Sequence, residues 1–242
     1  MTDPLYLDDP TRLDCEATVE RVVDDRVVLD RTCFYPEGGG QPADTGVLRA
    51  GDETWRVVDV QKRDTIYHHL AGDGAPPTAG TTVAGAVDAD RRRAHSRYHT
   101  AQHLLSALLL AEYDAATTGN QLYADRARLD CRYERFTDDD LAAIETRLNE
   151  LVDADLPVRW YTLDRAVAEN RLDPERTRLD LLPDSITEVR IVEIGDADDP
   201  FDRTACAGTH VERTAEIGRV AVTGRETRGP EEERVRFRLA DA

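Results

Sequence analysis

The chain has 242 residues with 31 basic and 49 acidic side chains, which gives a formal net charge of −18 at pH 7. Hydrophobic residues make up 40%, which is typical of a globular chain and excludes a disordered one. No apolar run approaches the roughly 18 residues of a membrane span, and the N-terminus lacks the basic and apolar regions of a signal peptide. We therefore expect a cytoplasmic protein without a membrane partner. The charge also speaks against a nucleic-acid partner, because phosphate contacts need cations.

The charged residues are used unevenly: Lys62 is the one lysine among the basic residues, and aspartates outnumber glutamates. A surface that is rich in carboxylates and poor in lysine holds water and stays soluble where salt is high. At molar salt the Debye length is about 3 Å, so repulsion among the carboxylates is screened. We interpret the composition as adaptation to a salt-rich cytoplasm. A coding bias towards arginine, aspartate and alanine is the alternative.

The first 90 residues are rich in short β-prone runs, and turn signals such as Asp24-Asp25 and Gly51-Asp52 separate the runs. Predicted strands lie at 16–23, 26–29, 47–49, 55–60 and 65–70, with 81–87 as an optional sixth. Strands at this spacing predict a small barrel. We place a β-barrel domain at residues 1–90, with the boundary near Asp90.

Residues 91–242 mix helices and strands, which predicts an α+β domain. A helix is predicted at 92–113, where leucines fall on one face. Thr137 is a good N-cap for a second helix because aspartates follow it, and we expect Pro157 to end that helix. Predicted strands lie at 127–133, 159–163, 188–194, 219–222 and 234–239, with a strand region at 215–218 and an acidic loop at 195–202. An antiparallel sheet with helices on one face satisfies these elements.

The four cysteines are widely spaced, with no Cys-x-x-Cys pair among Cys15, Cys33, Cys131 and Cys206. In a chain of this length without a signal peptide, such spacing does not indicate a disulfide framework. We expect buried thiols, with Cys206 as the exception.

Two elements could together hold a metal ion. His99 and His103 lie four residues apart on the predicted helix, so their Cβ atoms are about 5–6 Å apart on one face. Cys206 and His210 flank Gly208, which permits a tight turn. Three imidazoles and a thiolate are ligands that suit zinc. The alternative is that the histidines are structural and Cys206 packs in the core.

A glycine motif is the other concentration of chemically useful residues. Gly38, Gly39 and Gly40 let the backbone turn sharply or approach a ligand closely. Gln41 offers both a donor and an acceptor, and Thr32 offers a hydroxyl. A purely structural hairpin is the alternative for this segment.

Three motifs follow one another along the chain: Phe34-Tyr-Pro-Glu-Gly-Gly-Gly-Gln-Pro, His99-Thr-Ala-x-His103-Leu-Leu and Cys206-x-Gly-Thr-His210. Together they resemble the alanyl-tRNA editing family, which comprises the free-standing AlaX proteins and the editing domain of alanyl-tRNA synthetase. The resemblance covers the chain from about residue 13 to the end. A barrel followed by a catalytic domain, without a long coiled tail, is similar to the medium-sized AlaX type.

The resemblance implies a translation-factor-like barrel followed by an α+β domain like the editing domains of alanyl- and threonyl-tRNA synthetases. It implies an aminoacyl-tRNA deacylase that hydrolyses mischarged tRNA(Ala), chiefly Ser-tRNA(Ala) and secondarily Gly-tRNA(Ala). No obligate protein partner is expected.

The resemblance also implies roles for single residues. The family's ligands for one Zn²⁺ match His99, His103, Cys206 and His210. Gln41 matches the glutamine of the glycine motif, and Thr32 matches a threonine that relatives use to recognise the serine hydroxyl. Ala207 departs from the family pattern, which has glycine there, but it leaves both neighbouring ligands in place.

A tRNA substrate requires local cations rather than a positive total charge. We expect Arg91, Arg92 and Arg93, with the backbone of the glycine motif, to contact RNA. A second arginine-rich zone comprises Arg219, Arg225, Arg228, Arg234, Arg236 and Arg238. For any one of these arginines, pairing with a carboxylate is the alternative.

Two other function classes remain open. One is a zinc hydrolase that acts on another aminoacyl-tRNA or acyl ester. The other is a non-catalytic, zinc-structured RNA-binding module, which would not need Thr32, Gln41 and the four ligands together.

Overall fold

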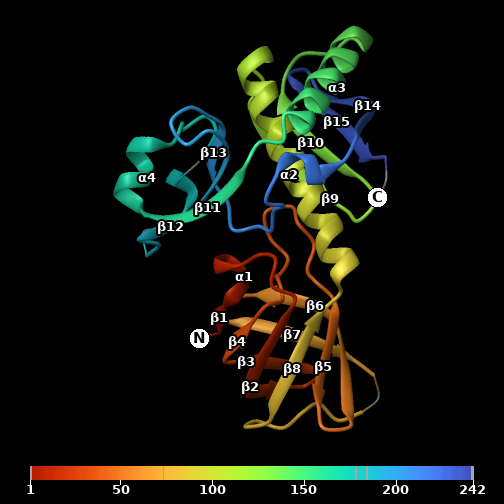
Figure 1. Ribbon diagram of the computed structural model, residues 1–242, viewed down its shortest axis with the longest axis vertical. Coiled ribbons are helices and arrows are strands. Elements are labelled where there is room, and N and C mark those ends of the chain that lie inside the picture. Colours follow the sequence, from red (N-terminus) through yellow and green to blue (C-terminus); the bar gives the residue numbers. More distant parts are fainter. Residues whose placement is uncertain (1, 73, 178, 184, 241–242) are drawn as a thin grey trace. The chain divides into compact units, whose positions relative to one another are not determined.

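The computed structural model describes residues 2–72, 74–177, 179–183 and 185–240 (Figure 1). It divides into two compact units, residues 1–95 (unit 1) and 96–242 (unit 2). The division falls inside helix α2 (Ala89–Tyr113), whose residues from Ser96 onward are described with unit 2. No helix among the described residues is long and apolar enough to cross a membrane.

Unit 1 contains a closed antiparallel barrel with the strand order β2-β3-β7-β6-β5-β8. The strands are β2 (Asp14–Val23), β3 (Arg26–Leu29), β5 (Gly46–Ala50), β6 (Glu53–Lys62), β7 (Ile66–Ala71) and β8 (Thr82–Val87). The expected barrel and all six of its strands are confirmed. The strand pair β1 (Asp3–Pro4) and β4 (Arg31–Thr32) and helix α1 (Leu5–Asp8) were not expected, because elements this short show no hydrophobic period.

The barrel interior is built by alternation, with one irregularity in β6. Trp55 and Val57 are buried, a register shift follows at Val58, and Val60 is buried again. Because the bulge adds one residue, it returns the apolar side chains to the interior instead of exposing them. The exposed Val58 is the extra residue.

The glycine motif is anchored to the barrel by Phe34, whose side chain is fully buried. A Cβ atom at Gly46 would lie 2.9 Å from the Phe34 ring, and one at Gly85 would lie 3.1 Å from it. Both distances are too short for ordinary packing. Glycine in β5 and β8 therefore makes room for the aromatic ring, and Gly46 also makes room for the Ala86 carbonyl oxygen, which would lie 2.1 Å from a Cβ atom there.

Unit 2 has two antiparallel sheets where one was expected, with strand orders β14-β15-β10-β9 and β11-β12-β13. The strands are β9 (Thr117–Leu122), β10 (Ala127–Arg132), β11 (Val158–Asp164), β12 (Glu188–Gly195), β13 (Pro200–Ala205), β14 (Val220–Gly229) and β15 (Glu232–Leu239). The second sheet forms because β11 and β12 pair with each other rather than with the first sheet, and the end of the expected acidic loop adds to β12 as β13. Proline and aspartate are depleted in strands, so this strand carried no sequence signal.

Helix α3 (Asp138–Asp153) begins at the expected cap. The Thr137 hydroxyl accepts a hydrogen bond from the backbone N–H of Asp140 at 3.1 Å, and the Asp140 carboxylate accepts one from the backbone N–H of Thr137 at 2.7 Å. The expectation that Pro157 ends this helix is wrong. The chain leaves the helix after Asp153, and Asp155 has a left-handed φ of 48° before the proline is reached.

The remaining elements of unit 2 are helix α4 (Arg165–Arg171) and the 3-10 helices η1 (Leu179–Leu181) and η2 (Thr214–Ile217). Helix η2 replaces the strand region expected at 215–218. The Glu216 carboxylate accepts hydrogen bonds from the backbone N–H groups of Glu212 and Arg213, which closes a turn there.

We expect Thr137→Ala to lower the free energy of unfolding of unit 2 by about 1 kcal/mol, because it removes the cap of α3. Thr146→Ala, at an exposed position in the middle of the same helix, is the control and should change it by less than about 0.5 kcal/mol. Denaturant unfolding measures both variants, and equal losses in the two would contradict the capping role.

Candidate metal centre

The structure brings together all four expected ligands, and their ligand atoms lie within 4.8 Å of one another. Helix α2 supplies His99 and His103 from successive turns, with ring centroids 5.2 Å apart. The three imidazoles are buried, and Cys206 is half-buried. The group can hold a metal ion.

The loop that follows β13 carries Cys206 and is fixed by hydrogen bonds on both sides. The backbone N–H of Gly208 donates to Cys206 Sγ at 3.3 Å. Arg190 Nη1 donates to the carbonyl oxygens of Cys206 at 2.8 Å and Gly208 at 3.1 Å. The Ser96 hydroxyl donates to Thr209 Oγ1 at 2.8 Å, which ties the loop to α2. The thiol is therefore held at a defined place beside the helix.

The spacing of the ligand atoms fits tetrahedral zinc. With Zn–S near 2.3 Å and Zn–N near 2.0–2.1 Å, a sulfur and a nitrogen ligand lie about 3.6 Å apart. Cys206 Sγ lies 3.6 Å from His99 Nε2 and 3.4 Å from His210 Nε2. Two edges of such a tetrahedron therefore already have the right length.

A buried carboxylate orients His103. His103 Nδ1 lies 2.9 Å from Asp202 Oδ2, so the ring donates there and leaves Nε2 for a metal. Arg176 holds the carboxylate through Nε to Oδ1 at 2.8 Å and Nη2 to Oδ2 at 3.0 Å. Arg176 Nη1 also donates to Ser106 Oγ of α2 at 2.9 Å. The imidazole, the carboxylate and the guanidinium thus form one rigid chain behind the ligand.

Thr100 does the same for His210. Its hydroxyl donates to the Ser96 carbonyl at 3.0 Å, so its oxygen accepts from His210 Nδ1 at 3.2 Å and from the backbone N–H of Val211 at 3.3 Å. This arrangement assigns the proton of His210 to Nδ1 and leaves Nε2 facing Cys206 Sγ.

The charges of the site are balanced internally. Burial raises the pKa of the Cys206 thiol, but the neighbouring imidazoles hold it well below its ordinary value, and the thiolate is the metal-binding form. Burial lowers the pKa of His103, but the hydrogen bonds to Asp202 and Cys206 outweigh it and raise the pKa to about 9. Arg176 and His103 keep the pKa of Asp202 below its ordinary value despite burial.

Asp202, Arg176 and Thr100 were not among the expected site residues. Metal-binding histidines need a partner for their second nitrogen, so a search for a carboxylate near the Cys206 motif could have found Asp202, four residues earlier. Arg176 and Thr100 carry no comparable signal.

The other expected site residues belong to unit 1 and are described there. Thr32 Oγ1 is buried, lies 2.8 Å from His68 Nε2 and accepts from the backbone N–H of Phe34 at 3.1 Å. His68 Nδ1 faces the Val27 carbonyl at 3.3 Å, so Nδ1 carries the proton and Nε2 accepts from Thr32. Burial lowers the pKa of His68 to about 4, which keeps the ring neutral. The Thr32 oxygen retains capacity for one further donor.

The glycine motif forms a tight hairpin turn. Gly38 and Gln41 exchange backbone hydrogen bonds of 3.1 and 2.9 Å. Gly39 and Gly40 have φ values of 59° and 83°, a left-handed pair that glycine adopts without strain. The backbone of the motif thus forms the hairpin that was considered as the alternative to a ligand site. The buried Gln41 side chain follows directly after the turn, and its chemical role stays a prediction.

The three consecutive arginines differ in their surroundings. The Arg92 guanidinium is buried, pairs with Asp44, and donates to the Cys33 carbonyl at 2.6 Å and the Pro10 carbonyl at 2.8 Å. Arg91 is half-buried. Arg93 is exposed and is the most accessible of the three.

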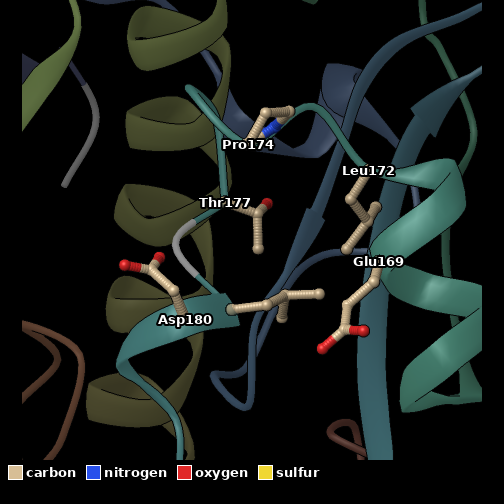
Figure 2. Close-up of a pocket in the computed structure, with 6 residues that line it drawn as sticks. Glu169, Leu172, Pro174, Thr177 and Asp180 are labelled. Carbon is tan, nitrogen blue, oxygen red and sulfur yellow. The ribbon is translucent and has the colours of Figure 1, made fainter.

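A pocket of about 420 Å³ lies beside α4 (Figure 2). Its lining residues are Glu169, Leu172, Pro174, Thr177, Leu179 and Asp180. Its described lining combines the carboxylates of Glu169 and Asp180 and the Thr177 hydroxyl with three apolar side chains.

We expect Arg92→Ala to lower the free energy of unfolding of unit 1 by about 3–5 kcal/mol, because it leaves the Asp44 carboxylate buried and unpaired. Arg93→Ala, one residue further, should change it by less than about 0.5 kcal/mol. Denaturant unfolding compares the two, and similar stabilities would show that the Asp44 pair does not support the fold.

Two family models match parts of the chain. Residues 9–91 match the model described as tRNA synthetases class II (A). Residues 189–236, which include Cys206 and His210, match the threonyl and alanyl tRNA synthetase second additional domain.

The chain is also similar over its whole length to curated proteins. It is 41% identical over 247 residues to the alanyl-tRNA editing protein AlaX-M of Methanosarcina barkeri, and 39% identical over 249 residues to that of Methanosarcina acetivorans, with all of each chain covered. It is 42% identical over 228 residues to the alanine–tRNA ligase of Halorubrum lacusprofundi, where 91% of this chain aligns with 24% of the ligase. The chain therefore belongs to the AlaX-M family of alanyl-tRNA editing proteins, which are deacylating hydrolases.

Proposed function

We propose that this chain hydrolyses the aminoacyl ester of mischarged tRNA(Ala), chiefly Ser-tRNA(Ala) and secondarily Gly-tRNA(Ala), with one Zn²⁺ per chain. The main support is a group of three buried imidazoles and one half-buried thiol, in which both sulfur–nitrogen distances fit a tetrahedral zinc site, in a chain of the alanyl-tRNA editing family. We also propose that the enzyme works in a salt-rich cytoplasm, on the ground of its net charge of −18 and its single lysine.

The ligand set favours zinc over other divalent ions, because it combines a thiolate with imidazoles and lacks carboxylate or carbonyl oxygens. When bound, Zn²⁺ would supply Lewis-acid chemistry or a fixed anchor for a substrate group. Four protein ligands fill a tetrahedral shell, so a structural role for the ion is the alternative within this proposal. In either role, Asp202 and Thr100 keep the two imidazoles that they contact in the tautomer that exposes Nε2.

Thr32 is the residue proposed to give specificity for serine. Its oxygen gives its proton to His68 and accepts from the Phe34 N–H, so the substrate hydroxyl would have to be the donor. Alanine has no such hydroxyl and would leave this buried acceptor unmatched. Sites that demand a hydroxyl can discriminate by about 10⁴–10⁵-fold.

Gln41 and the arginines are the remaining proposed substrate contacts. The Gln41 amide, which follows the tight turn, would orient a water molecule or the ester through its donor and acceptor. Arg93 and Arg91 would contact RNA phosphates together with the Gly38–Gly40 backbone. Arg92, which was expected to act with them, would support the site through Asp44 instead.

A deacylation panel tests the proposal. Purified protein in concentrated KCl is offered Ser-, Gly- and Ala-tRNA(Ala) and a seryl-tRNA of another acceptor. We expect rapid loss of the seryl ester of tRNA(Ala), slower loss of the glycyl ester, retention of the alanyl ester, and activity that persists or rises towards molar salt. Preference for another tRNA would assign the chain to the other deacylase class. RNA binding without hydrolysis would assign it to the non-catalytic class.

We expect Cys206→Ala to abolish bound zinc and deacylation together, because a thiolate ligand is lost. Cys131→Ala is the matched control, since Cys131 is a buried thiol of β10 outside the ligand group. Elemental analysis and the Ser-tRNA(Ala) assay measure both variants. Full activity of Cys206→Ala without metal would refute the metal role.

Thr32→Val should narrow the preference for seryl over alanyl ester, because it removes the acceptor for the substrate hydroxyl, whereas Thr32→Ser should retain the preference. The readout is the ratio of kcat/KM for the two esters, with thermal unfolding to show that the loss of the bond to His68 has not unfolded unit 1. An unchanged ratio in Thr32→Val would show that Thr32 does not recognise the serine hydroxyl.

Asp202→Asn should raise the Kd for zinc by about 10–100-fold, because it weakens the hold on His103 and leaves Arg176 unpaired. Asp198→Asn is the control, at an exposed position of the loop between β12 and β13. Competition with a chelating dye measures both, and equal affinities would exclude Asp202 from positioning the ligand.

A further inference from the structure

The four-stranded sheet of unit 2 has one buried face and one face that carries arginines. Along β15, Val235, Phe237 and Leu239 are buried, so the alternate residues Arg234, Arg236 and Arg238 project to the opposite side. Strand β10 adds Arg128, which pairs in register with Arg236. The β9–β10 turn adds Arg126. We name these residues the arginine face: Arg126, Arg128, Arg234, Arg236 and Arg238.

Carboxylates neutralise only part of this charge. Asp130 is shared by Arg128 and Arg234, with nitrogen–oxygen distances of 2.6 Å to each. Glu226, on β14, is shared by Arg228, Arg234 and Arg236.

The two ends of the arginine face are less neutralised. Arg126 pairs with Asp125, the residue beside it in the chain. Arg238 has no carboxylate within ion-pair distance in the described part of the chain, and it is exposed. Arg236 has half of its side chain exposed. Guanidinium groups therefore outnumber carboxylates here, in a chain where carboxylates dominate overall.

The arginine face also lines a hollow of about 480 Å³. Besides the arginine face, its lining residues are Tyr123, Ala127, Thr223 and Phe237. Tyr123 is among the few large hydrophobic residues that are exposed, and the Arg126 guanidinium lies 4.3 Å from the centre of its ring. An exposed aromatic ring beside several guanidinium groups offers stacking and phosphate contacts together.

We propose that the arginine face binds the sugar–phosphate backbone of RNA and serves as a second contact for the tRNA substrate; the choice of tRNA rests on the proposed function. Alternate residues of β15 lie about 7 Å apart, which is comparable to the separation of successive phosphates along a strand. The guanidinium fork suits phosphate oxygens. The contact positions the RNA and carries no base specificity. Arg234, which is held by Asp130, orders the face, while Arg126, Arg236 and Arg238 reach the ligand.

The test compares two double variants of equal charge. Arg236→Gln with Arg238→Gln removes two exposed members of the arginine face. Arg147→Gln with Arg213→Gln removes two exposed arginines elsewhere in unit 2, each paired with a carboxylate. Binding of uncharged tRNA(Ala) is measured by fluorescence anisotropy over a series of KCl concentrations, so the readout does not depend on catalysis.

We expect the first variant to bind tRNA more weakly and to reduce the slope of log K against log salt by about 1.5–2, which corresponds to two lost phosphate contacts. The control should keep the wild-type slope. Arg236→Lys with Arg238→Lys should restore most of the slope, which a mere folding defect would not allow.

An unchanged slope in the glutamine variant would overturn the proposal. Polyglutamate serves as a second probe, which stands for an acidic protein. If the glutamine variant binds tRNA as the wild type does but no longer binds polyglutamate, the arginine face binds an acidic protein and the proposal is overturned. If Ser-tRNA(Ala) is not deacylated but RNA binding still depends on Arg236 and Arg238, the arginine face stands and the catalytic proposal falls.

Discussion

The convergence of three imidazoles and one thiol on one point is the constraint on which unit 2 depends. His99 and His103 are placed by helical periodicity alone, one turn apart on α2. Cys206 has no such support, and its loop is fixed by Arg190 on one side and by the Ser96–Thr209 bond on the other. The hydrogen bonds around the centre orient the imidazole rings and hold the Cys206 loop in place without the help of a bound ion.

The pairing of a buried carboxylate with arginine, seen behind the metal centre, recurs elsewhere in the molecule. The pairs are Asp44–Arg92, Asp202–Arg176, Glu193–Arg203 and Glu233–Arg225. A buried charge costs several kcal/mol unless it is paired, and the guanidinium fork can satisfy two oxygens at once. The arginines therefore have a structural use at any salt concentration. The net charge of −18 comes from the excess of carboxylates over basic side chains. The arginine face is a local exception to this acidic surface.

Much of the fold and the group of four His and Cys side chains could be predicted from the sequence, because they follow from local spacing and short motifs. The barrel strands show alternation and turn signals, and the two histidines of α2 are four residues apart. Strand β13 could not be predicted, because it contains a proline and an aspartate, which are uncommon in strands. The sequence could not show that Arg92 is buried and Arg93 exposed, because Arg92 is buried against Asp44, which is 48 residues away in the chain. Asp202 acts through a fold-dependent contact with His103, and in the sequence only its position four residues before Cys206 sets it apart from the neighbouring acids.

Zinc K-edge X-ray absorption on the purified protein tests the central claim, that these four side chains form one zinc centre. We predict one zinc per chain with a shell of one sulfur at about 2.3 Å and three nitrogens at about 2.0–2.1 Å. A chain that binds no zinc, or a shell without sulfur, would contradict it.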